Sequence, residues 1–322
     1  MKIKAIAYLV ALSAGLLTGL PAWSQAYPTK PVTIIVPYQA GQGTDVAARL
    51  FAEQLSKAMG QQVIVDNKPG AGGNIGTAAA ARSAADGYTL LMGTVATQTM
   101  NEFLYPSVGY DSDKDFAPVI LVGMLPMVIS ANPSFAASTI AELIAAAKAQ
   151  PDKLNIALPS TTARIVFELL KARTGAPLFG VPYKGSATAM NEVMGGQVQL
   201  IIDTATASRG HVQSGKLKAL AITTLKSSEL LPGVKSVAEQ GFPGFEVTAW
   251  NAIYAPRGTP KEIVDRLNAE VTKVLAQPET RQRLMQLGFE PAGGSPEALA
   301  AYEKQERAKW GPLIKAAGLK GD

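Results

Sequence analysis

The sequence predicts an α/β protein built from two doubly wound parallel sheets in two lobes. Apolar strands alternate with helical patterns along the chain, and this series runs twice, before and after a long uncharged segment at 118–130. Strands that alternate with helices form parallel sheets, because a helix supplies the crossover that a parallel pair needs. Three successive strands also end in turns of small residues, where ligands of such sheets bind.

The first 26 residues differ in composition from the rest of the chain. Lys2 and Lys4 precede an uncharged run over 5–20, and Ser24 and Ala26 place small residues at the two recognition positions of a cleavage site. These features predict a secretory signal peptide at 1–26 that is cleaved after Ala26. The uncharged run is short for a membrane span, so we expect residues 27–322 to form a soluble, exported protein.

Composition limits the possible functions of this chain. Its 322 residues are 47% apolar, which is enough for two domains. The absence of cysteine excludes disulfides, thiolate nucleophiles, zinc–thiolate sites and a lipoprotein anchor. The formal charge of +5 falls to +3 without the two signal-peptide lysines, and no run of five basic residues occurs. We therefore expect no nucleic-acid partner.

The first strand and helix of the series form the clearest motif. The segment Val32–Val36 is apolar and rich in β-branched residues, which is typical of a strand buried on both faces. A loop with Gly41 and Gly43 follows, and a helical pattern begins at Thr44, which suits the N-cap, with Asp45 in the first turn. This arrangement presents free backbone N–H groups above the sheet edge, where an anion is the natural occupant.

The remaining elements repeat this alternation. In the first series we expect strands at 63–65 and 88–92 and a helix at 75–85. In the second series we expect helices at 140–149, 163–173 and 187–194 with strands at 154–158, 197–202 and 219–223. Helices at 261–276, 279–287 and 296–317 complete the chain.

Two segments predict the connection between the lobes. Residues 118–130 are too long for one ordinary strand and contain Pro126, so we interpret them as two strand halves that cross into a second lobe. Residues 247–254 are interpreted as the returning crossover strand. The first lobe would then contain 27–125 and 250–322, and the second 126–249. Such a pair of lobes leaves a cleft that opens and closes on a hinge.

Cofactor and catalytic motifs are incomplete. Two dinucleotide fingerprints fail because Val46 and Ile75 replace a required glycine, and a phosphate-loop pattern fails at Leu217. His211 is the only histidine and has no partner within reach in the sequence, and no nucleophile elbow is present. We expect no cofactor, no metal and no catalytic residue.

Neutral hydrogen-bond donors recur at the strand ends. Such donors at helix starts hold a carboxylate without burying an opposing charge that must be desolvated. Plain N-capping is the alternative for any one of them, but their accumulation at successive turns favours an anion site. They are Thr44, Thr94, Thr97, Ser160, Thr161, Thr162 and Thr204.

Several motifs in order resemble one family. The chain resembles the Bug family, the periplasmic solute-binding proteins of tripartite tricarboxylate transporters, and the resemblance extends over the whole mature chain. The motifs that carry it lie at 27–31 (YPTKP), 35–45 (IVPYQAGQGTD), 67–76 (NKPGAGGNIG), 86–91 (DGYTLL), 114–119 (KDFAPV), 181–185 (VPYKG) and 215–221 (GKLKALA).

This resemblance implies a two-lobed periplasmic binding protein, type II-like, that closes on a carboxylated solute held by backbone amides, hydroxyls and bridging waters. Two departures stand out: Gln42 interrupts a run of glycines, and Arg164 lies near a position where the family has histidine after a glycine-rich loop. Arg164 would pair with a distal carboxylate of the solute or face solvent. The ligand-binding residues carried over by position are Tyr38, Ala40, Gly41, Gly43, Thr44, Asp45, Thr94, Thr97, Ser160, Thr161, Thr162, Arg164, Tyr183, Asp203 and Thr204.

The function that we expect is capture of a small organic carboxylate, with a dicarboxylate favoured, in the cleft between the lobes. The monomeric protein would act in the periplasm, meet the transporter membrane subunits transiently and catalyse no reaction. One alternative is an aromatic carboxylate or dicarboxylate that stacks on a ring such as Tyr38. Another is a carboxylate-sensing receptor that engages a signalling partner.

Overall fold

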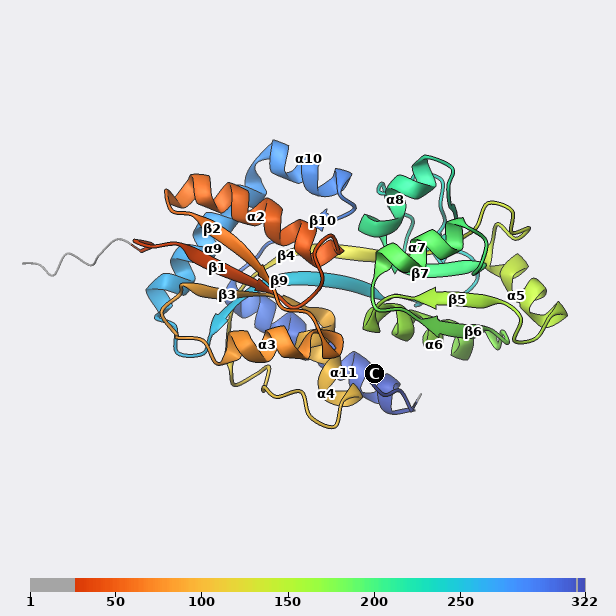
Figure 1. Cartoon of the computed structure of the whole chain (residues 1–322), viewed down its shortest axis with the longest axis horizontal. Helices are drawn as coiled ribbons and strands as arrows, with labels where there is room; N and C mark the ends of the chain where they lie inside the picture. The colour runs from red at the N-terminus through yellow and green to blue at the C-terminus, as the bar shows by residue number, and fades with distance from the viewer. Residues whose placement is uncertain (1–26, 317, 322) are drawn as a thin grey trace, which may run out of the picture.

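The computed structural model describes residues 27–316 and 318–321, so the predicted signal peptide lies outside the described part. The fold consists of two lobes, each a sheet with helices packed on it, and strands β4 (Phe116–Ala131) and β9 (Thr248–Pro256) run through the region between them (Figure 1). This architecture confirms the predicted α/β fold class. Within the described residues, no helix combines the length and apolarity that crossing a bilayer requires.

The first lobe contains the strand order β2-β1-β3-β9-β4. Strand β1 (Val32–Val36) pairs in parallel with β2 (Val63–Asn67) and β3 (Thr89–Thr94), whereas β9 is antiparallel to both β3 and β4. A short strand β10 (Glu290–Pro291) pairs with β4. The parallel strands end at one edge of the sheet, and the antiparallel register places Asn251 of β9 opposite Thr94 of β3 at that edge.

The second lobe contains the order β4-β7-β5-β6. Strands β5 (Asn155–Leu158), β6 (Phe179–Pro182) and β7 (Leu200–Thr204) are parallel, and β8 (Lys218–Ile222) pairs with β4 on its other side. The carboxyl ends of β5, β6 and β7 therefore lie together, as the alternating pattern predicts.

Strand β4 belongs to both lobes. Its residues up to Pro126 pair with β9, and Met127–Ala131 pair with β7 and β8. The sequence predicts two strand halves here, whereas the structure has one continuous strand whose halves have different partners. Two register shifts, at 118–120 and 121–123, accompany the pairing with β9. Pro126 lies where the partners change, a position at which a missing N–H costs little.

The helices cover the two sheets. Each buries one apolar face, as Leu50, Phe51 and Leu55 do on α2, and each large apolar side chain buried in this way contributes about 1.5–3 kcal/mol. The first lobe has α2 (Gly43–Met59), η1 (Ala71–Gly73), α3 (Asn74–Ala81), η2 (Ala96–Met100), α4 (Asn101–Leu104), α9 (Lys261–Ala276), α10 (Pro278–Gln286) and α11 (Pro296–Ala316). The second lobe has α5 (Ile140–Ala149), α6 (Thr161–Thr174), α7 (Ser186–Met194) and α8 (Ala205–Gln213).

The first predicted strand and the predicted helices at 140–149 and 261–276 are confirmed at both ends. The N-cap predicted for the first helix is wrong. This helix begins at Gly43, one residue earlier than expected, and its N-cap is Gln42, whose extended backbone has no capping side-chain bond. Helix α8 was not expected, because its residues include glycine, serine and histidine, which favour helices weakly.

Candidate functional site

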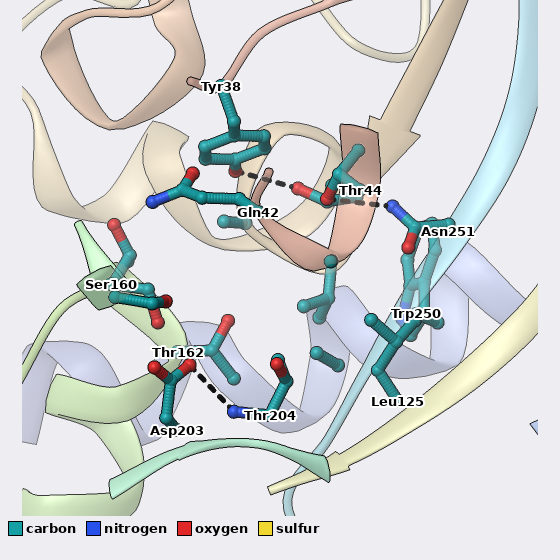
Figure 2. Close-up of a pocket in the computed structure, with 17 residues that line it drawn as sticks. Tyr38, Gln42, Thr44, Leu125, Ser160, Thr162, Asp203, Thr204, Trp250 and Asn251 are labelled. Atoms are coloured by element: carbon teal, nitrogen blue, oxygen red, sulfur yellow. Dashed lines mark hydrogen bonds between the residues drawn. The ribbon is translucent and has the colours of Figure 1, made fainter. Parts of the chain in front are cut away.

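A cavity of about 60 Å³ lies where the strand ends of the two lobes meet (Figure 2). Its wall combines the start of α2, the end of β3 with the following turn, the starts of α6 and α7, the end of β7, and β9. The described lining contains no lysine, arginine or histidine, and Tyr38 and Asp203 are its titratable groups. An anion in this cavity would therefore be held by neutral groups.

The first lobe contributes a helix start whose N–H groups no side chain caps. Gln42 is the N-cap of α2 but makes no capping bond, so no side chain caps the N–H groups of this helix start, and Gly43 and Thr44 line the cavity. The Thr44 hydroxyl accepts a hydrogen bond from Asn251 Nδ2 at 3.1 Å (Figure 2). Uncapped N–H groups and the positive end of the helix dipole favour an anion here.

Tyr38 and Thr94 add two hydroxyl groups to the same wall. Their oxygens lie 3.0 Å apart, and the Thr94 N–H donates to Thr97 Oγ1 at 3.1 Å. Burial raises the pKa of Tyr38 to about 12, so its hydroxyl is neutral and can donate. Thr97 thus bonds the backbone of Thr94 but does not line the cavity.

The second lobe directs three helix starts at the cavity. Ser160 caps α6 by accepting from Ala163 N–H at 3.2 Å, and Thr204 caps α8 by accepting from Ala207 N–H at 3.3 Å. Helix α7 begins at Ser186 without a capping side chain. The helices of both lobes thus point positive ends at one small space.

Asp203 is the one carboxyl group in the described cavity lining. It ends β7 at 2% exposure, and its Oδ1 accepts from Thr204 N–H at 2.7 Å (Figure 2). Its Oδ2 has no hydrogen-bond partner. Burial raises the pKa of Asp203 to about 6, and the nearby hydroxyls of Ser186 and Thr204 and the Thr204 N–H only partly oppose this.

Asp45 lies outside the cavity lining and fixes the loop that precedes α2. Its carboxylate accepts from Gly41 N–H at 2.8 Å, from Asn67 Nδ2 at 2.9 Å and from the Arg49 guanidinium. Asn67 also donates to Tyr38 O at 3.0 Å, which ties the loop to β2. Burial opposes ionisation of Asp45, but these bonds outweigh it and lower its pKa below the ordinary value.

A larger outer chamber of about 620 Å³ opens next to the cavity. Tyr38 and Ser160 line both spaces, whereas Arg164, Tyr183 and Lys184 line the outer chamber alone. Arg164 Nη2 donates to Lys320 O at 2.8 Å, and Tyr183 donates to Glu192. The cationic side chains of the cleft therefore lie outside the inner cavity.

The lobes touch across the cleft. A Cβ atom placed on Gly185 of the second lobe would lie 3.2 Å from both Gln39 Oε1 and Gln42 Nε2 of the first. A Cβ atom on Gly43 would lie 3.1 Å from Leu125 and 3.6 Å from Thr204 Oγ1. The loops of the two lobes thus approach each other closely, and two glycines permit this spacing.

The structure brings most of the carried-over residues together and separates a few. Ala40, Gly41, Asp45 and Thr97 line neither space. Arg164 and Tyr183 line only the outer chamber. The inner cavity is lined by Tyr38, Gly43, Thr44, Thr94, Ser160, Thr161, Thr162, Asp203 and Thr204.

Several lining residues were not expected from the sequence. Asn251 and Trp250 lie in the segment interpreted as a crossover strand, and the asparagine inside this apolar segment is the sequence feature that indicates a polar role. Ser186 follows Gly185 at a helix start, where free backbone N–H groups favour an anion. The other unexpected lining residues are Gln42, Val95, Ala96, Leu125 and Ala249.

Comparison with known proteins identifies the family of this chain. The sequence profile described as tripartite tricarboxylate transporter family receptor matches residues 47–319, and the chain belongs to this family. It is accordingly a periplasmic solute-binding protein and not an enzyme. BugT of Bordetella pertussis is 37% identical over 303 residues, which cover 93% of each chain. A protein of Pseudomonas sp. strain P51, from the tcbD-tcbE intergenic region, is 39% identical over 90% of this chain and 87% of its own length.

Solved structures extend the similarity to the whole fold. The periplasmic binding protein BugD has a TM-score of 0.85 at 39% identity and covers 91% of this chain and 99% of its own. An R. palustris protein solved with adipate has a TM-score of 0.88 at 38% identity with the same coverage. MatC of Rhodopseudomonas palustris, solved with malate, has a TM-score of 0.83 at 32% identity and covers 89% of this chain and 100% of its own.

Proposed function

We propose that this protein captures a small organic dicarboxylate in its cleft and delivers it to the membrane subunits of a tripartite tricarboxylate-type transporter. The observation that carries the proposal is the meeting of helix N-termini from both lobes on a cavity whose described lining contains no cationic side chain. The site residues carried over from the sequence are part of this proposal.

Carboxylates suit this cavity better than sugars or amines do. A carboxylate accepts several hydrogen bonds at once, and backbone N–H groups at α2 and α7 have no capping side chain that competes for them. An amine would meet the positive ends of the helix dipoles. Neutral donors also avoid the desolvation that a buried lysine or arginine would require.

The sizes of the two spaces support a solute with two carboxyl groups. The inner cavity of about 60 Å³ has room for one carboxylate with a few waters, and the outer chamber of about 620 Å³ has room for the remainder. Arg164 and Lys184 line that chamber and would attract a second carboxylate. The similar proteins solved with adipate and malate hold solutes of this class.

Delivery requires that the partner distinguish the loaded from the empty receptor. A solute that touches both lobes stabilises the closed form, because its affinity for that form is higher. Gly185 lies close to Gln39 and Gln42 of the other lobe, and we expect this approach to be lost when the lobes separate. Closure would thus present a surface that a membrane subunit can recognise.

An aromatic dicarboxylate is the second candidate. Three tyrosines, Tyr38, Tyr105 and Tyr183, line the outer chamber. Such rings stack on an aromatic solute at centroid distances of about 4.5–7 Å. The same inner cavity would then hold one carboxylate of the aromatic solute.

A thermal-shift screen tests this function. The panel contains adipate, malate, terephthalate, benzoate, a sugar and an amine. We expect stabilisation by carboxylates alone, of about 2.7 kcal/mol when the ligand is present at 100 times its dissociation constant. Stabilisation by the sugar or amine alone would overturn the carboxylate assignment.

Two threonine substitutions test the site. Thr44→Val and Thr162→Val each remove one hydroxyl from the cavity wall and should each raise the Kd about tenfold, which is about 1.4 kcal/mol. Thr272→Val on the exposed face of α9 is the matched control and should leave the Kd unchanged. Wild-type affinity in both cavity variants would mean that the solute binds elsewhere.

A further inference from the structure

The inner cavity contains an acid that a carboxylate receptor does not obviously need. Asp203 is 2% exposed, Oδ1 accepts from Thr204 N–H, and Oδ2 has no hydrogen-bond partner. Figure 2 shows its carboxyl group on the cavity wall beside Thr162 and Thr204. A buried polar atom without a hydrogen-bond partner destabilises the folded protein, so we expect an atom of the ligand to bond Oδ2.

No cation from the packed elements neutralises this acid. On α6, Arg164 donates to Lys320 O and lines the outer chamber. On α8, Arg209 Nη1 donates to Met285 O at 2.6 Å, and its Nε has no partner. Lys184, before α7, is exposed on the outer chamber.

The acids of the surrounding elements have their own partners. Glu192 on α7 accepts from Tyr183, and Asp45 on α2 accepts from Arg49. Strands β4, β5 and β9 present no charged residue to the described lining. The carboxyl of Asp203 therefore faces the solute without a competing charge.

We infer that Asp203 is protonated in the complex and donates a hydrogen bond to the solute carboxylate, so that capture of the anion takes up one proton from the solvent. This inference deepens the proposed function and rests on it. The donor is the carboxyl O–H, and the acceptor is a carboxylate oxygen of the solute. No covalent bond forms or breaks other than the O–H bond of Asp203.

Charge repulsion is the physical reason. Two ionised carboxylates in one closed cavity without a cation repel each other, and binding of the second raises the pKa of the first. A protonated carboxyl instead supplies one more donor of the kind that lines the rest of the wall. Since burial already raises the pKa of Asp203 to about 6, protonation near neutral pH costs little.

The opposite arrangement makes the opposite prediction. An ionised Asp203 would pair with an ammonium group of an amino-carboxylate solute. Binding would then strengthen as the pH rises through the pKa of Asp203, and only solutes with an amino group would bind tightly. The direction of the pH dependence therefore separates the two arrangements.

Calorimetry on the full mature chain tests the proton uptake. The probe is adipate, or whichever carboxylate of the screen stabilises the protein most, used above about pH 6.5, where its own carboxyl groups are ionised. We expect the Kd to rise by up to about tenfold per pH unit above the pKa of Asp203. Titrations near pH 7 in two buffers of different ionisation enthalpy should show uptake of nearly one proton per bound solute.

Two substitutions locate the proton. Asp203→Asn keeps a donor at this position, so its Kd should match that of the wild type at acidic pH and no longer depend on pH. Glu303→Gln is the control, because burial raises the pKa of Glu303 to about 7 although its partner is Tyr254, outside the described cavity lining. This control should keep the wild-type pH dependence.

Each outcome has a distinct meaning. Binding without proton uptake, a pH dependence that persists in Asp203→Asn, or amino-carboxylate binding that strengthens with pH would overturn the inference and leave carboxylate capture standing. Failure of every carboxylate in the panel at every pH would overturn the proposed function itself. If Asp203→Asn does not fold, the proton count of the wild type decides alone.

Discussion

Asp45 in the first lobe and Asp203 in the second are both 2% exposed and both lie next to a helix start at the cleft side of a sheet. Asp45 receives bonds from Gly41, Asn67 and Arg49, and these lower its pKa although burial opposes them. Asp203 receives one backbone bond, and burial raises its pKa to about 6.

The difference teaches that burial alone does not give a carboxyl group its role. The hydrogen bonds of Asp45 all lie within the first lobe and fix the loop that contains Tyr38 and Gly43. Asp203 lines the cavity and its Oδ2 atom has no hydrogen-bond partner, so an atom of the solute can bond it. One acid builds the site, and we propose that the other meets the ligand.

The largest expected effect comes from removing the satisfied acid. Asp45→Ala leaves the Gly41 N–H without its acceptor and removes one of the two acceptors of Asn67 Nδ2, and we expect the free energy of unfolding to fall by about 3 kcal/mol. Urea denaturation near pH 7 measures this loss. Arg49→Ala, which removes a half-exposed partner of the same acid, should cost about 1 kcal/mol or less. Equal losses in the two variants would contradict the assigned role of the backbone loop.

A smaller effect of opposite sign is expected at the unsatisfied acid. Because the pKa of Asp203 is raised in the folded protein, its stabilising contribution is complete below about pH 4 and is lost as the pH rises through about 6. The rise from 3.8 to about 6 corresponds to roughly 3 kcal/mol at neutral pH as an upper limit. Asp203→Asn should therefore stabilise the ligand-free protein by roughly 2 kcal/mol near pH 7.5, and by much less near pH 4.

Thermal melts across this pH range check the sign. Asp45→Asn should show the reverse trend, since a lowered pKa adds stability above the ordinary pKa that is lost only as the pH falls through the folded value. A parallel pH response of the two asparagine variants would remove the contrast between the lobes.

The third prediction concerns the contact that joins the two loops. Gly185 has an extended backbone that any residue adopts, but a side chain there would meet Gln39 and Gln42. Gly185→Val should hinder closure and raise the Kd about tenfold, which is about 1.4 kcal/mol, with unchanged stability of the ligand-free protein. The control is Gly210→Val on exposed α8, where an added Cβ meets nothing within 4 Å. Small-angle scattering with saturating ligand would show whether the variant stays open.

Local sequence patterns predicted much of this fold. Val32–Val36 and the helices at 140–149 and 261–276 have unambiguous apolar periodicity, and the structure has the same bounds. The role of Thr44 was harder, because its hydroxyl bonds Asn251, 207 positions later, rather than its own helix. Only the pairing of β9 with β3 brings those residues together.

The two aspartates show the same limit for the site. In sequence both lie in turns that follow a predicted strand, so nothing local separates them. Their difference depends on Asn67, 22 positions from Asp45, whereas no side-chain amide among the described residues bonds Asp203. The tertiary structure therefore decides which carboxyl group has its hydrogen bonds satisfied within the protein and which one can bond a solute.

The shared strand β4 has a consequence for how this molecule folds and is engineered. Because one strand lies inside both sheets, neither lobe expressed by itself would have a complete hydrogen-bonded edge, and heating should produce a single cooperative transition. Fusion partners or reporter dyes therefore belong on outer helices such as α5 or α10, away from the backbone that both halves use in common.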